Sequence, residues 1–138
     1  GEQPEPVVED VHHELERIDA PAPVLSVEGL DMFGGARMRT LHAAIAGDAA
    51  LKRLRGRVLA AVRGAGVAVA RERFVPHVTL ARFSRPPEGE DRARLEAFLA
   101  RRLEIRTQPF RVESFVLWRS HLTASGPAYE PLAEYPLG

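Results

Sequence analysis

A histidine and a threonine two residues apart are the strongest candidates for chemistry in this sequence. His77 and Thr79 lie in residues 73–82, RFVPHVTLAR, an apolar run of residues that favour β-strands. Side chains alternate between the faces of a strand, so we expect His77 and Thr79 on one face and Val78 and Leu80 on the other, toward a core. An imidazole can transfer a proton near neutral pH, and a hydroxyl can hold an anionic oxygen. The alternative is a histidine with an ordinary place in a half-buried strand.

The composition indicates one globular domain and excludes several classes of function. The 138 residues are 45% hydrophobic and 28% charged, with a formal net charge of zero, which argues against a broadly basic protein that coats nucleic acid. The absence of cysteine excludes a disulfide framework, thiolate chemistry and zinc-finger spacing. No apolar run approaches the roughly 20 residues of a membrane span, and we expect a cytoplasmic protein. Lys52 is the only lysine. Arginine pairs well with phosphate, but nucleotide-composition bias is the stronger explanation of the arginine content.

Helical and strand patterns alternate along the whole sequence. We expect helices over 6–18, 49–63 with Asp48 as the N-cap, and from 90 to about 103. Strands are expected over 24–30, 37–46, 110–118 and 129–137, in addition to the His77 strand, with a turn at 33–36. The mixture predicts the α+β class and a single domain over residues 1–138.

The run from Phe74 to Arg82 resembles the second signature of the two-histidine phosphoesterases, specifically the LigT-like RNA 2′,3′-cyclic phosphodiesterases, also called 2′-5′ RNA ligases. Residues 109–120 and 125–137 resemble the penultimate strand and the C-terminal end of that family. Residues 39–45 fit the strand before its middle helix, although an aromatic residue is more usual where His42 stands. The resemblance implies two lobes of antiparallel strands backed by helices around a central cleft, with one His-x-Thr in each lobe.

The first His-x-Thr of the family is missing from this sequence. It should lie on a strand just before the helix that begins near Pro4, and the chain begins Gly1-Glu2 where that signature normally ends. We therefore expect an N-terminally truncated domain that is inactive or weakly active alone. His121-x-Thr123 lies in the C-terminal region, where the family has no such motif, and we interpret it as a chance occurrence.

The resemblance implies hydrolysis of 2′,3′-cyclic phosphate, in RNA or a nucleotide, by paired histidines without a metal or other cofactor. In this sequence it assigns a proton transfer to His77, phosphate binding to Thr79 and charge stabilisation to Arg82. Phe74 either packs near the base or ribose or belongs to the core. The partners implied are RNA or nucleotide ends and no membrane. The alternative is a non-catalytic module that binds nucleotide or phosphate with one half-site.

Two geometric expectations follow for the site. Strict alternation places Arg82 on the face opposite His77, so Arg82 requires a strand end, a bulge or its own long reach. We also expect His77 and Thr79 to face a cleft, with Arg82 and at least one further group nearby, chosen from Arg37, Arg39, Arg119 and His121.

Overall fold

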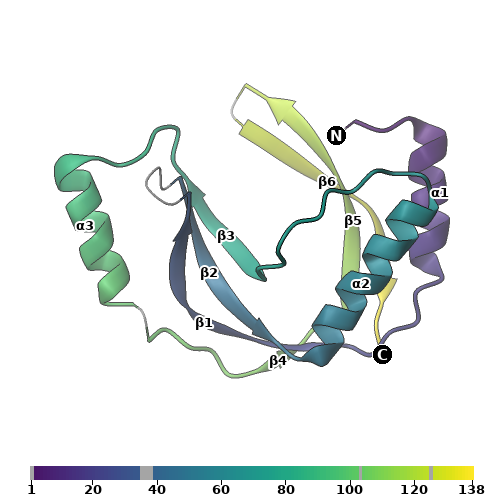
Figure 1. Ribbon diagram of the computed structural model, residues 1–138, viewed down its shortest axis with the longest axis horizontal. Helices are drawn as coiled ribbons and strands as arrows, with labels where there is room; N and C mark the ends of the chain where they lie inside the picture. The colour runs from purple at the N-terminus through teal and green to yellow at the C-terminus, as the bar shows by residue number, and fades with distance from the viewer. Residues whose placement is uncertain (1, 35–38, 103, 125) are drawn as a thin grey trace. The chain divides into compact units, whose positions relative to one another are not determined.

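The computed structural model describes residues 2–34, 39–102, 104–124 and 126–138. It shows helices and antiparallel strands mixed along the chain, as the sequence pattern predicts (Figure 1). The chain divides into two compact units. The first unit comprises Gly1–Val24, Asp48–Glu72 and Arg111–Gly138, and the second comprises Leu25–Gly47 and Arg73–Phe110.

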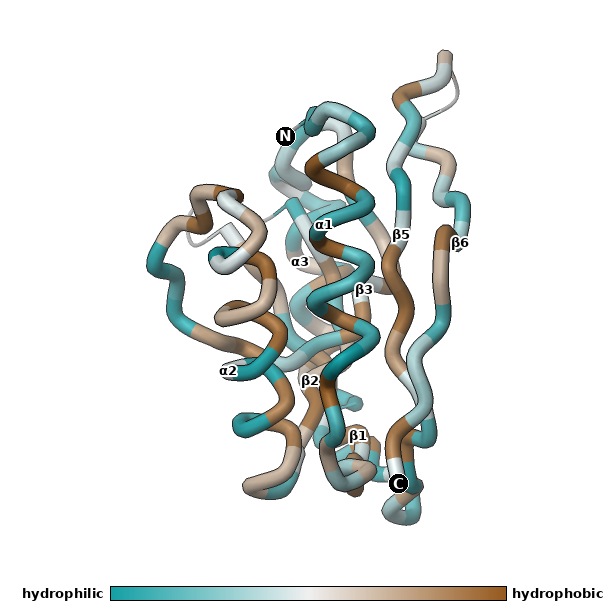
Figure 2. The backbone as a smooth tube through the Cα atoms, turned by 90° about the vertical axis from the view of Figure 1, so that its right-hand side faces the viewer, coloured by the Kyte–Doolittle hydropathy of each residue, from teal (hydrophilic) through white to brown (hydrophobic). Residues whose placement is uncertain are grey.

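The first unit packs two helices and a β-hairpin around a small core. Its helices are α1 (Glu5–Glu16) and α2 (Ala49–Gly64), and its strands are β5 (Ser114–Thr123) and β6 (Gly126–Pro136). Hydrophobic and hydrophilic residues alternate along both helices in Figure 2, as expected for helices with one buried face. The core joins both helices to the last strand through Val11, Leu15, Ala61 and Tyr135.

Asp48 begins α2 as predicted. Its backbone is extended, and its carboxylate accepts hydrogen bonds from the backbone N–H groups of Ala50 and Leu51 at 2.9 and 3.2 Å. The same carboxylate accepts a third bond, from the N–H of Val24 at 3.2 Å. These bonds, the one from Val24 above all, hold the pKa of Asp48 below its ordinary value. The cap therefore also ties the start of α2 to the residue where β1 begins.

The second unit is built on a sheet with the strand order β3-β2-β1-β4. These strands are β1 (Val24–Phe33), β2 (Thr40–Gly47), β3 (His77–Arg82) and β4 (Phe110–Arg111), and one helix, α3, spans Gly89–Ala100. β2 pairs antiparallel with both β1 and β3. The His77 strand is therefore at the edge of the sheet, next to a central strand that holds it in register.

The expected core side of the His77 strand is wrong. Val78 and Leu80 are each 52% exposed. The reason is that β3 is an edge strand and that α3, the helix of the same unit, has no buried residue with which to cover it. Apolar alternation identified the two faces of the strand but could not show whether anything covers either face.

Strand boundaries also differ from the expected ones. The strand predicted over 110–118 divides into β4 and β5, which belong to different sheets. The break falls at Val112 and Glu113, whose backbones bond instead to Pro23 and Leu137. Phe33 is the last residue of β1, and the rest of the expected turn lies largely outside the described residues. No helix in the described part of the chain is long and apolar enough to cross a membrane.

Candidate active site

The His77 ring is held in one orientation by the backbone of the segment that directly precedes its strand. Its Nδ1 atom lies 2.7 Å from the carbonyl oxygen of Val75, two residues earlier. A carbonyl oxygen can only accept a hydrogen bond, so Nδ1 must carry the hydrogen. In the neutral ring, Nε2 is then the unprotonated nitrogen. His77 is exposed, so this nitrogen is the one available to accept a proton from a ligand or, once protonated, to return it.

Two other rings pack against His77, and we call the three of them the ring cluster: Phe33 of β1, His42 of β2 and His77 of β3. The centroids of Phe33 and His42 lie 3.7 Å apart with the rings stacked at 16°. The His77 ring meets both nearly edge-on, Phe33 at 4.7 Å and 87° and His42 at 5.4 Å and 71°. Edge-to-face and stacked contacts of this kind are favourable and directional. Phe33 and His42, on the other two strands, thus limit rotation of the His77 ring.

Strand register places three proposed site residues on one face of the sheet. His77 pairs with Ala44, Thr79 with His42 and Arg82 with Thr40. Residues 40, 42 and 44 alternate along β2 and so share a face, and residues paired across strands share that face too. His77, Thr79 and Arg82 therefore lie on the same side.

A bulge brings Arg82 to this side. The register of β2 with β3 shifts between Leu41 and His42, where the partners are Ala81 and Thr79. Leu80 is the extra residue, and one extra residue reverses the alternation that follows it. Of the three routes that the sequence left open for Arg82, the structure uses the bulge.

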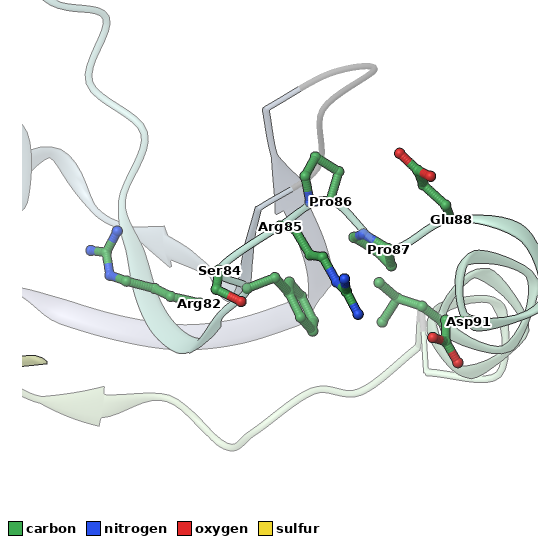
Figure 3. A pocket seen from close by; sticks show the side chains of 9 residues that line it. Arg82, Ser84, Arg85, Pro86, Pro87, Glu88 and Asp91 are labelled. Carbon is green, nitrogen blue, oxygen red and sulfur yellow. The ribbon is translucent and has the colours of Figure 1, made fainter. Parts of the chain in front are cut away.

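Arg82 also borders a hollow of about 720 Å³ at the end of β3. In Figure 3 its guanidinium group lies at one end of the labelled residues, and the carboxylates of Glu88 and Asp91 lie at the other. Within the described residues, the lining includes Ser84 and Arg85 but neither His77 nor Thr79. The cleft expected around His77 and Thr79 stays a prediction.

The other cationic groups expected near His77 lie in different parts of the chain. The Arg39 carbonyl accepts a hydrogen bond from the N–H of Phe83 at 2.8 Å, so Arg39 lies beside the end of β3. Arg119 and His121 belong to the first unit, where they pair with Glu5 and Glu130. Arg37 lies outside the described residues. Phe74 is 37% exposed in the irregular segment before β3, and its role stays a prediction.

Two members of the ring cluster have no role in the sequence-based interpretation. The local pattern places Phe33 in a turn, and His42 stands out only as a departure from an aromatic position. Burial lowers the pKa of His42, and the neighbouring His77 lowers it further, whereas Asp31 and a hydrogen bond to the Thr40 backbone oppose this. Finding the ring cluster requires the register of the β1–β2 hairpin, which pairs Asp31 with His42.

Comparison with known proteins assigns the family. Residues 1–124 match the family model of the 2′-5′ RNA ligase superfamily. The chain belongs to this superfamily. No curated protein sequence matches it.

Solved structures of low sequence identity share the fold. A crystal structure described as a phosphoesterase is 19% identical with a TM-score of 0.72, covering 99% of this chain and 72% of that one. E. coli LigT in its apo form is 18% identical with a TM-score of 0.71, with coverages of 99% and 71%. TT0787 of Thermus thermophilus is 24% identical with a TM-score of 0.66, with coverages of 99% and 73%. The superfamily member described here therefore has a LigT-like α+β fold, and LigT itself has also been crystallised with 3′-AMP and with phosphate.

Proposed function

We propose that this superfamily member opens 2′,3′-cyclic phosphates, at RNA ends or in nucleotides, to leave a 2′-phosphate. One observation carries the proposal: His77 is exposed on the same face as Thr79 and Arg82, its Nδ1 is committed to the Val75 carbonyl, and its Nε2 makes no hydrogen bond among the described residues. The complexes of E. coli LigT with 3′-AMP and with phosphate support a ligand of this class.

The reaction requires two proton transfers on opposite sides of phosphorus. Water attacks the phosphorus and gives a proton to a base, while the bond to the 3′-oxygen breaks and that oxygen takes a proton from an acid. Each such transfer typically contributes about 10²–10⁴-fold to the rate. We assign one transfer to Nε2 of His77 and require no metal for either.

The neighbouring residues would hold the phosphate. The Thr79 hydroxyl can donate to a non-bridging oxygen, and the Arg82 guanidinium can pair with the negative charge. Charge that grows during attack is then met by groups already in place, which is an efficient way to lower a barrier. Phe74 is proposed to pack against the base or ribose.

The second proton-transfer group must come from elsewhere than β3. His121-x-Thr123 is a poor candidate because both of its side chains have partners within the β5–β6 hairpin. The Nε2 atom of His121 lies 3.1 Å from a carboxylate oxygen of Glu130, and the Thr123 hydroxyl donates to the Gly126 carbonyl at 2.6 Å. We propose that a second His-x-Thr, on polypeptide beyond these 138 residues, completes the site.

The deciding experiment compares two proteins on a nucleoside 2′,3′-cyclic phosphate in the presence of EDTA. The 138-residue chain should turn over slowly or not at all, and a longer product with a second His-x-Thr should release the 2′-phosphate. Full activity of the 138 residues would overturn the two-histidine account.

A non-catalytic module remains the second candidate, favoured by the single His-x-Thr on this sheet. It predicts binding of 3′-AMP without turnover in both proteins.

Including RNA with 2′,3′-cyclic phosphate and 5′-hydroxyl ends in the assay tests whether 2′-5′ ligation accompanies hydrolysis.

A further inference from the structure

His42 is an unusual choice for its position. It is 1% exposed, and among the described residues the only other buried side chain with a polar atom is Tyr135, whose hydroxyl bonds to His12. Its Nδ1 atom has no hydrogen-bond partner within the described part of the chain. A buried polar atom left unpaired destabilises the folded state, because it loses its hydrogen bonds to water and gains none in the protein. A phenyl ring could stack on Phe33 without that cost, so packing alone does not account for an imidazole here.

The position of His42 links it to the proposed site. It stacks on Phe33 at 3.7 Å, meets the His77 ring at 5.4 Å, and pairs across the strands with Thr79. The charged groups that act on it are Asp31 on β1 and His77 on β3. Burial shields it from ligand and solvent, so it acts on the reaction only through its neighbours.

We propose that His42 is a positioning residue: its neutral imidazole orients the His77 ring and presents an unshared electron pair to the positive charge that His77 acquires when it takes a proton. The proposal rests on the proposed function of His77. A neutral imidazole carries a hydrogen on one ring nitrogen and an unshared pair on the other, and Nδ1 is the His42 nitrogen that is buried without a hydrogen-bond partner among the described residues. Two charged imidazoles this close would repel, and burial favours the proton on the exposed His77 rather than on His42.

The first test separates the nitrogen atoms of His42 from its shape. His42→Phe keeps a ring against Phe33 and removes both nitrogens. We expect an unfolding midpoint at or above that of the wild type, a kcat about tenfold lower on a 2′,3′-cyclic nucleotide, and an unchanged KM. The measurement is made in whichever protein is active in the assay above. A folded His42→Phe protein with wild-type kcat would overturn the proposal.

The second test requires neither turnover nor a variant at position 42. Long-range ¹H–¹⁵N spectra of the 138-residue chain report the charge and tautomer of each histidine ring. We expect His42 to gain its proton at a lower pH than the ordinary histidine pKa of 6.5, and His77→Ala to raise that pH, with His121→Ala as the matched control. A His42 that gains its proton at pH 6.5 or above, or no response to His77→Ala, would overturn the proposal even if the chain hydrolyses its substrate. Should neither protein turn over substrate, these spectra alone decide the proposal.

Discussion

The carbonyl oxygen of Val75 lies 2.7 Å from Nδ1 of His77. Val75 precedes Pro76, and a residue before proline is restricted to extended conformations. The Pro76 carbonyl in turn accepts a hydrogen bond from the N–H of Ile45 on β2 at 3.1 Å. The residue types at 75–77 thus fix the backbone that selects the His77 tautomer. Pro76 thus helps to orient the His77 imidazole, because it restricts the backbone of Val75.

His77→Ala should remove most of the hydrolysis with little effect on folding. We expect a loss of about 10²–10⁴-fold in turnover of a 2′,3′-cyclic nucleotide, the usual contribution of one proton-transfer group. His77 is exposed, so the unfolding midpoint should change little. Product release at pH 7 is the measurement, in the protein that carries both His-x-Thr motifs. His13→Ala, an exposed histidine on α1, is the matched control, and equal losses in both variants would contradict the assignment.

Thr79→Val should weaken binding of 3′-AMP without disturbing β3. Valine keeps the β-branched shape and removes the hydroxyl that we assign to a phosphate oxygen. Loss of one hydrogen bond to a charged group predicts about tenfold weaker binding by calorimetry. Thr107→Val removes a hydroxyl that accepts a hydrogen bond from the Val27 N–H instead, and it should leave binding intact. Wild-type affinity in Thr79→Val would exclude the hydroxyl from the site.

Arg82→Ala should weaken binding of 3′-AMP, whereas deletion of Leu80 should leave it intact. Without the extra residue β3 pairs with β2 by regular alternation, and Arg82 still lies opposite Thr40 on the face of His77 and Thr79. We expect Arg82→Ala to weaken 3′-AMP binding about tenfold and to reduce its dependence on salt, and the deletion variant to bind like the wild type. Arg94→Ala, on the exposed surface of α3, should have no effect. Wild-type binding by Arg82→Ala, or loss of binding by a folded Leu80 deletion variant, would contradict this placement of the guanidinium.

Asp48→Ala should destabilise the first unit, and the effect should be smaller in acid. The unit loses the N-cap of α2, so the melting temperature should fall by a few degrees. Because the folded pKa of Asp48 is depressed, its contribution is complete above the ordinary value of 3.8 and is lost as the pH falls through the folded pKa. Glu88→Ala is the matched control, since the residue before α3 makes no side-chain cap. A fall in melting temperature that is equally large at pH 7 and at pH 3 would contradict this account.

Features that depend on residues close in the sequence were predicted better than the pairing between strands. Asp48 and the periodicity of residues 6–18 were sufficient to place α2 and α1, because caps and helical repeats depend on near neighbours. The shared face of His77 and Thr79 also followed from alternation alone. The position of Arg82 depended on a bulge between strands, and the ring cluster joins three strands through their register. Nothing within a single strand encodes those relationships, so they could not be found from local patterns.

The bond between His12 and Tyr135 has a consequence for synthesis of the chain. Nδ1 of His12 lies 2.9 Å from the Tyr135 hydroxyl, and Tyr135 belongs to the core with Val11 and Leu15. Helix α1 can therefore pack against Tyr135 only after the ribosome has added the 123 residues that follow His12. The sheet of the second unit draws mainly on residues 25–110 and can pair earlier. On a ribosome we expect the unit that carries His77 to form first, and the unit that contains α1 to be the last to close.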